Sequence, residues 1–113
     1  MGFSSTFETA EPDREQIDSG HGPLVLEFGA PWCSHCQQAV RHIAAAFETF
    51  PSRPHVKIED GPGRPLGRSY RVKLWPTLIF LESGKEVARL IRPTETAPIV
   101  DALAQIASAA RTG

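Results

Sequence analysis

The chain has 113 residues, with 12 Lys and Arg against 13 Asp and Glu and a formal net charge of −1. This length is typical of one domain, so we expect a single domain over residues 1–113. The near balance of charge argues against nucleic acid and anionic membranes as partners. The longest apolar runs are far shorter than the roughly 18–20 residues that span a bilayer, and the start of the chain has no apolar signal segment. We therefore expect a cytoplasmic protein without a membrane-spanning helix.

A short helix and a buried strand are predicted first along the chain. Residues 12–17 begin with Pro and continue with acidic side chains, as the first turn of a helix often does. The run Leu24–Phe28 is nearly all apolar and is bounded by Gly and Pro, which is typical of a strand buried on both faces. Glu27 then lies inside a core strand. The alternative is an edge strand on which Glu27 meets water.

A long helix and a second strand follow. Apolar residues at helical spacing predict a helix over residues 33–50, and no Gly or Pro interrupts it. Apolar and polar residues alternate over 55–60, which predicts a strand. In that strand we expect Lys57 to face solvent, and we assign no role to His55.

The second half of the chain predicts a short helix, a hairpin and a last helix. A loop rich in Gly and Pro leads to a helical piece that ends near Tyr70. Apolar runs over 77–81 and 86–91 are joined by four residues that include Gly, which predicts an antiparallel hairpin. Thr94 is expected to cap the last helix, with Glu95 in its first turn. A parallel β-α-β start and an antiparallel finish predict an α/β sandwich, in which helices flank a central mixed sheet.

The residues that carry chemistry are in the segment Trp32-Cys33-Ser34-His35-Cys36. Cysteines at i and i+3 lie one helical turn apart, so their sulfurs reach bonding distance with little backbone change. We expect Cys33 to be the nucleophile, because free N–H groups and the positive end of the helix dipole favour a thiolate at the helix start. Cys36 lies one turn deeper, where it can attack a mixed disulfide formed on Cys33. A protonated His35 stabilises the Cys33 thiolate and so makes the pair more oxidising.

Other uses of two cysteines fit the sequence less well. Zinc usually needs four ligands, but there is no second Cys pair, and His42 points about 120° away from Cys36 around the helix. Covalent haem needs a His directly after the second Cys, where this chain has Gln37. A structural disulfide in so short a loop adds little stability and is reduced in the cytosol. We therefore expect no metal, and no cofactor beyond the redox-active pair of Cys33 and Cys36.

The segment 24–36, with its two cysteines, is followed by Trp75-Pro76-Thr77 and then by a strand-Gly-strand hairpin. This order of motifs resembles the thioredoxin family over roughly residues 20–110. The resemblance implies a central mixed sheet flanked by helices. It also implies an activity, which is thiol–disulfide exchange with protein substrates.

By position, the resemblance implies roles for several residues. Cys33 matches the attacking cysteine of the family, and Cys36 matches the resolving one. Pro76 matches the cis-proline beside the active site. Glu27 matches the buried acid that moves the proton of Cys36, and Lys57 falls where the family often places a Lys beside that acid.

Four departures from the family pattern argue against the general function of an ordinary thioredoxin. Ser34-His35 replaces Gly-Pro between the cysteines, as in oxidising and isomerising relatives, and Gly29 replaces a common Trp. On the docking face, Trp75 replaces a smaller aliphatic residue and Arg92 replaces a Gly. The expected substrate-binding residues are Trp32, Trp75, Pro76 and Arg92.

We therefore expect a thiol–disulfide oxidoreductase that exchanges with protein substrates and with a protein or small-thiol electron donor, as a monomer. Its expected catalytic residues are Cys33, Cys36, Glu27 and His35. The alternative is a non-catalytic module of the same fold, which holds a partner polypeptide in the groove beside Pro76.

Overall fold

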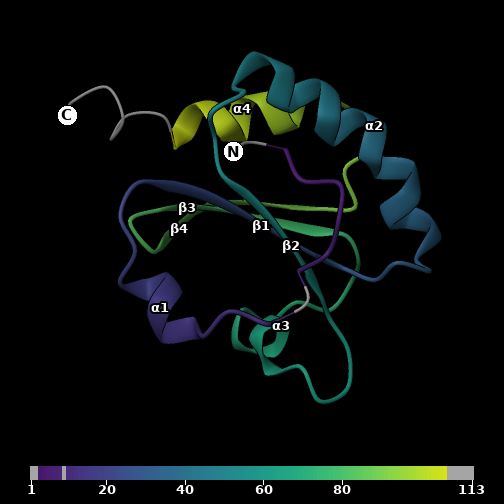
Figure 1. The fold of residues 1–113 in the computed structure, drawn as a ribbon. Helices are drawn as coiled ribbons and strands as arrows, with labels where there is room; N and C mark the ends of the chain where they lie inside the picture. The colour runs from purple at the N-terminus through teal and green to yellow at the C-terminus, as the bar shows by residue number, and fades with distance from the viewer. Residues whose placement is uncertain (1–2, 9, 107–113) are drawn as a thin grey trace.

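A four-stranded mixed sheet forms the centre of the computed structural model, which describes residues 3–8 and 10–106 (Figure 1). The strands are β1 (Pro23–Gly29), β2 (His55–Glu59), β3 (Thr77–Glu82) and β4 (Lys85–Ile91), in the spatial order β2-β1-β3-β4. β1 and β2 are parallel, whereas β1 and β3 are antiparallel, as are β3 and β4. β1 therefore lies inside the sheet, which explains why its sequence is apolar on both faces.

Two pairs of helices cover the two faces of the sheet (Figure 1). One face carries α2 (Ser34–Thr49) and α4 (Ala97–Gln105), and the other carries α1 (Arg14–Asp18) and α3 (Pro65–Ser69). These layers confirm the predicted α/β sandwich with a mixed central sheet. The single domain over 1–113 stays a prediction, and both of its ends lie outside the described residues. None of the described helices is long and apolar enough to cross a membrane.

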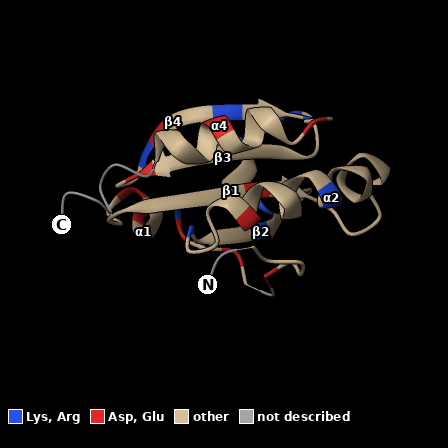
Figure 2. Ribbon diagram, turned by 90° about the horizontal axis from the view of Figure 1, so that it is seen from above, with Lys and Arg blue, Asp and Glu red and all other residues tan. Residues whose placement is uncertain are grey.

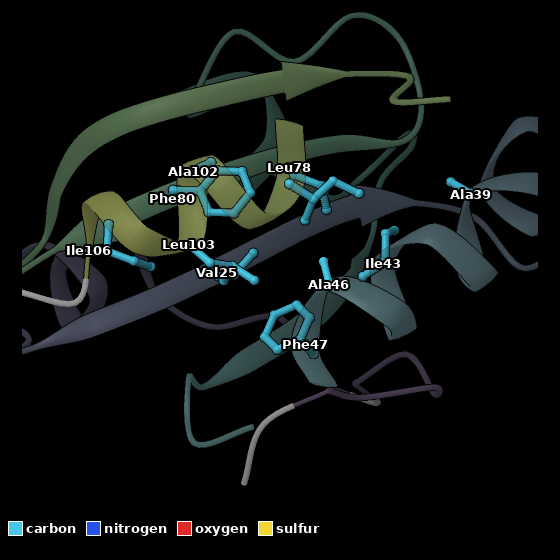
Figure 3. Close-up of a cluster of buried hydrophobic side chains, with 11 residues drawn as sticks. Val25, Ala39, Ile43, Ala46, Phe47, Leu78, Phe80, Ala102, Leu103 and Ile106 are labelled. Atoms are coloured by element: carbon cyan, nitrogen blue, oxygen red, sulfur yellow. The ribbon is translucent and has the colours of Figure 1, made fainter. Parts of the chain in front are cut away.

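Each face of the sheet has its own apolar core. The α2/α4 core, shown in Figure 3, consists of Val25, Ala39, Ile43, Ala46, Phe47, Leu78, Phe80, Ile99, Ala102, Leu103 and Ile106. The α1/α3 core consists of Ile17, Leu26, Phe28, Ile58, Leu66, Tyr70, Ile79 and Leu81. Successive side chains of a strand point to opposite faces of the sheet, and β1 follows this rule. Val25 faces α2 and α4, whereas Leu26 and Phe28 face α1 and α3.

The two edges of the sheet are shielded in different ways. β4 contains Lys85, Glu86 and Arg89, whose positions are coloured on the ribbon in Figure 2, and such charges oppose pairing with another strand. β2 is instead covered by the N-terminal segment 3–8. In it, Phe7 forms a parallel bridge with Lys57, and the Glu8 N–H donates to the Lys57 carbonyl at 2.9 Å. His55 and Lys57 are buried, so the expectation that Lys57 faces solvent is wrong.

The last helix begins later than predicted. α4 starts at Ala97 with Thr96 as its N-cap, so the expected cap at Thr94 is wrong and Glu95 lies before the helix. Pro98 explains the shift, because proline has no N–H and fits a helix only in its first turn. A start at Glu95 puts Pro98 at the fourth helical position, where the backbone N–H is needed for a hydrogen bond.

Candidate active site

Both cysteines lie where β1 leads into α2. Cys33 is the N-cap of α2, and its own N–H donates to the Ala30 carbonyl at 3.2 Å. The Cys33 Sγ accepts the Cys36 N–H at 3.2 Å. An N–H of the first helical turn has no carbonyl partner within the helix, so this sulfur takes the place of the oxygen of an ordinary capping residue. Both cysteines are free, and Cys33 is the more accessible of the two, at 7% exposed against 3%.

The thiol of Cys36 is strongly biased towards its protonated form. Burial is the largest cause that raises the pKa of Cys36 to about 12, followed by the hydrogen bond with Cys33. The negative charge of Glu27 adds to the same shift. The thiol lies against Gly29, where a Cβ would be 2.5 Å from the Cys36 Sγ. Gly29, one of the departures from the family pattern, therefore makes room for this thiol.

Glu27 lies two residues before Gly29, on the same face of β1. It is 1% exposed and belongs to an interior strand, which excludes the alternative of a solvent-exposed edge. Its Oε1 is 2.8 Å from the Nε2 of His55, whereas its Oε2 has no hydrogen-bond partner among the described residues. Lys57 is directly opposite Glu27 in β2, with its Nζ 4.6 Å from the centre of the Phe7 ring.

Two residues of the site go beyond the sequence-based expectations. His55 contacts Glu27, and Asp60 accepts the Trp75 Nε1–H at 2.9 Å. The sequence does hold a signal for His55: it precedes Lys57 by two residues, so both side chains share one face of β2. Since the family resemblance places Lys57 beside the buried acid, the same alternation could have placed His55 on that face. The contact of Asp60 with Trp75 has no such signal, because it joins two loops.

The expected substrate-binding residues lie together beside the cysteines. Trp32 is 71% exposed, and its ring meets Trp75 edge-on with 5.4 Å between the ring centres. The Trp75–Pro76 peptide bond is cis. Arg92 has a φ of 51°, a left-handed conformation that glycine adopts more readily than a residue with a side chain. Its backbone N–H donates to the Pro76 carbonyl at 2.8 Å and its Nε to the Trp75 carbonyl at 2.9 Å, so the side chain is held against this loop.

A groove of about 310 Å³ lies between the start of α2 and the loop after β4. Four of its lining side chains carry positive charge or can be protonated: His35, Arg41, His42 and Arg92. No acidic side chain of the described residues lines it. Charge is otherwise sparse on α2, whose 16 residues include one Arg and one Glu (Figure 2). The groove therefore offers an anionic group a positive surface beside the cysteines.

The site combines groups that suit reversible chemistry at sulfur. One thiol accepts an N–H at a helix start, and a second thiol one turn away is kept protonated by burial. Behind them is a buried carboxyl group with one oxygen free of hydrogen bonds to the described residues. Such a set can form and open a disulfide. In the described part of the chain, no three His, Cys, Asp or Glu side chains are grouped so as to hold a metal ion.

Comparison with known proteins gives a consistent result. The family model described as Thioredoxin matches residues 6–105. The structure of thioredoxin 2 from Pseudomonas aeruginosa PAO1 in its reduced form is similar at 44% identity and a TM-score of 0.78, over 97% of this chain and 100% of that one. A protein disulfide-isomerase from Hordeum vulgare is 34% identical over 92 residues, which is 74% of this chain. The chain spans only 18% of that isomerase. A thioredoxin H-type from Ricinus communis is 26% identical over 86 residues, covering 74% of this chain and 73% of that protein.

Proposed function

Because the chain belongs to the thioredoxin family, we propose that it is a thiol–disulfide oxidoreductase that acts on protein partners through Cys33 and Cys36. The observation that carries this proposal is the difference between the two thiols. The Cys33 Sγ accepts an N–H at the start of α2, which favours the thiolate that attacks disulfides. Cys36 remains a protonated thiol until it attacks the mixed disulfide, because burial raises its pKa to about 12.

The proposed cycle has two steps. In the first, the Cys33 thiolate attacks one sulfur of a substrate disulfide, forms a mixed disulfide, and releases the other substrate sulfur as a thiolate. In the second, Cys36 gives its proton to Glu27 and its sulfur attacks Cys33. The Cys33–Cys36 disulfide forms, and the remaining substrate sulfur leaves as a thiolate. The two electrons that reduce the substrate come from the cysteine pair, which needs no other cofactor, and the reverse cycle oxidises substrate dithiols.

Glu27 is the proton acceptor of the second step. At neutral pH a thiol with a pKa of about 12 is almost entirely protonated. In the mixed disulfide Cys33 no longer bears a charge or a free thiol, but burial, the largest cause of the raised pKa, remains. Cys36 therefore needs a nearby base, and Glu27 has an oxygen without a hydrogen-bond partner among the described residues.

The groove beside the cysteines favours partners with acidic residues next to the exchanged disulfide. Arg92 lies against the loop of Trp75 and Pro76 beside the cysteines, Arg41 adds a second positive charge to the groove, and His35 adds one when it is protonated. Desolvating these cations on binding is costly unless the partner supplies an acid. We expect the electron donor, which regenerates the dithiol of Cys33 and Cys36, to be a protein or a small thiol. A monomeric state and a cytoplasmic location stay predictions.

Reduction of insulin disulfides in the presence of dithiothreitol tests the activity. We expect the wild-type chain to accelerate it and Cys33→Ser to abolish the acceleration. Cys36→Ser traps a mixed disulfide with the substrate, which Cys33→Ser cannot form. A non-catalytic module that holds polypeptides beside Pro76 gives neither acceleration nor adduct, so these two readouts separate the alternatives.

We propose that His35 sets the redox potential of the pair. It is exposed in the first turn of α2, between the cysteines, where a cation stabilises the Cys33 thiolate and therefore the reduced form. We expect a potential of roughly −250 to −190 mV, between those of thioredoxin and protein disulfide isomerase. His35→Pro should make it more negative. Equilibration with glutathione buffers measures both values, and an unchanged potential in His35→Pro rejects this role.

A further inference from the structure

We propose that His55 is a positioning residue for proton transfer at Glu27, and that the N-terminal residues Phe3 and Ser4 hold His55 in the tautomer that this requires. The inference rests on the proposed role of Glu27 in the second step of the cycle. It adds a residue and a segment that the exchange chemistry of the two cysteines does not by itself call for.

The hydrogen bonds around His55 determine where its proton lies. The backbone N–H of Ser4 is 2.8 Å from the His55 Nδ1, and the His55 Nε2 is 2.8 Å from the Glu27 Oε1. A backbone N–H can only donate, so Nδ1 accepts and carries no hydrogen. The ring is then neutral with its hydrogen on Nε2, and it donates to Glu27. The contact is therefore a directed hydrogen bond from imidazole to carboxyl, not an ion pair.

Aromatic packing fixes the orientation of the His55 ring. Phe3 stacks on it with 5.4 Å between ring centres and 30° between ring planes. Phe47 of α2 stacks on it with 4.9 Å and 24°. The His55 side chain is 0% exposed, so no water competes for either ring nitrogen. The ring cannot turn without breaking both stacks and both hydrogen bonds.

This fixed donor decides which oxygen of Glu27 can take a proton. Oε1 is occupied by His55, which leaves Oε2 as the oxygen without a partner among the described residues. The carboxyl group faces the same side of β1 as Gly29, against which the Cys36 thiol lies. Without the His55 donor, the carboxyl group can rotate and present either oxygen in several directions. Misplacement of a reacting group by about 1 Å can cost up to about 10²-fold in rate.

Two substitutions at His55 separate positioning from packing, because both remove the ring. His55→Gln keeps an N–H at the place of Nε2, whereas His55→Asn can accept from Ser4 but is too short to reach Glu27. Single-turnover kinetics follow the formation and the resolution of the mixed disulfide separately. We expect His55→Asn to slow resolution about tenfold with first attack unchanged, and His55→Gln to recover most of the loss.

The outcomes distinguish this inference from the proposed function. Equal loss in His55→Gln and His55→Asn, or equal slowing of both steps, leaves His55 with a structural role only. If Glu27→Gln does not slow resolution, the proposed function of Glu27 fails, whatever the His55 variants do. Urea unfolding of both His55 variants shows whether they share the same loss of stability, as their common loss of the ring predicts.

The tautomer of His55 can itself be measured, in the wild-type chain and in variants of Ser4. Long-range ¹H–¹⁵N NMR spectra of the His55 ring should show hydrogen on Nε2 alone in the wild-type chain. Ser4→Ala keeps the backbone N–H and should give the same spectrum, whereas Ser4→Pro removes that N–H and should populate both tautomers. Hydrogen on Nδ1 in the wild-type chain, or a Ser4→Pro spectrum identical to that of Ser4→Ala, overturns the proposal.

Discussion

The two faces of the central sheet are both buried, but among the described residues only one face holds acidic and basic side chains in its interior. The face under α2 and α4 contains Glu27, His55 and Lys57 beside its apolar core. The face under α1 and α3 is apolar apart from Tyr70, whose ring lies under the Arg14 guanidinium at 3.8 Å. The apolar residues of both faces stabilise the fold, whereas the buried polar groups of one face lie behind the cysteines, where we propose that they take part in exchange.

Burying ionisable groups is costly unless each finds a partner, and the N-terminal segment supplies several of the partners here. Phe3 and Ser4 contact His55, and Phe7 lies over the ammonium of Lys57. The apolar face needs no such cover. A substitution in the α1/α3 core should therefore change stability alone, whereas a substitution of the buried polar groups on the α2/α4 face should change the rate of exchange.

The largest expected effect is a loss of stability on the apolar face. Leu26→Ala removes a fully buried side chain between β1 and the α1/α3 layer. We expect about 2–5 kcal/mol lower free energy of unfolding, because the lost contacts leave a cavity. Urea unfolding measures this value. The single-turnover rates of the remaining folded protein should match those of the wild-type chain, and a slower resolution step contradicts the separation of the two faces.

The next effect is kinetic and belongs to the other face. Glu27→Gln should slow resolution on the order of 10²-fold, because the amide cannot accept the proton of Cys36. First attack should be unchanged, and the amide oxygen can still accept from His55. Glu82→Gln is the control, since Glu82 is a half-buried acid of the same sheet that lies at the hairpin end of β3, away from the cysteines. Slowing of both steps, or of neither, counts against the role of Glu27.

A smaller effect concerns the causes of the raised pKa of Cys36. In Cys33→Ala the hydrogen-bond partner and the charge of Cys33 are lost, while burial remains as the largest cause. The pKa of Cys36 should therefore fall below 12 but stay above the ordinary value of a thiol. The pH dependence of iodoacetamide alkylation measures it. If the pKa of Cys36 in this variant equals that of an ordinary thiol, burial is not the main cause of the raised pKa.

The smallest effect lies on neither face but at the exposed edge strand β4. The hydrogen bond with Arg89 lowers the pKa of Glu86, so the pair stabilises the fold while Glu86 is ionised. Solvent screening limits the contribution to about 0.5 kcal/mol. The difference in unfolding free energy between wild type and Glu86→Gln should be present at neutral pH. It should disappear as the pH falls below the lowered pKa, because Glu86 is then protonated in both the folded and the unfolded chain. A difference that grows at low pH contradicts this assignment.

The elements that could be predicted from the sequence are those that depend on neighbours along the chain. The apolar run of β1 between Gly and Pro, the helical spacing of α2 and the Gly-containing hairpin of β3 and β4 are all found in the structure. The position of Cys33 at the start of α2 follows from the same local spacing. The start of α4 could have been predicted too, since Pro98 restricts it by a local rule.

Tertiary structure alone decided how the site behind the cysteines is built. Ser4 and His55 are 51 residues apart in the chain, and His55 and Glu27 are 28 apart, yet two hydrogen bonds of 2.8 Å join them. The alternation in β2 shows that His55 and Lys57 share a face, but it cannot show which other segment will cover that face. Here the N-terminal segment covers it, which turns two polar residues of an edge strand into buried neighbours of Glu27. The spacing of residues along a strand determines which side chains lie together, whereas burial depends on what the rest of the chain packs against them.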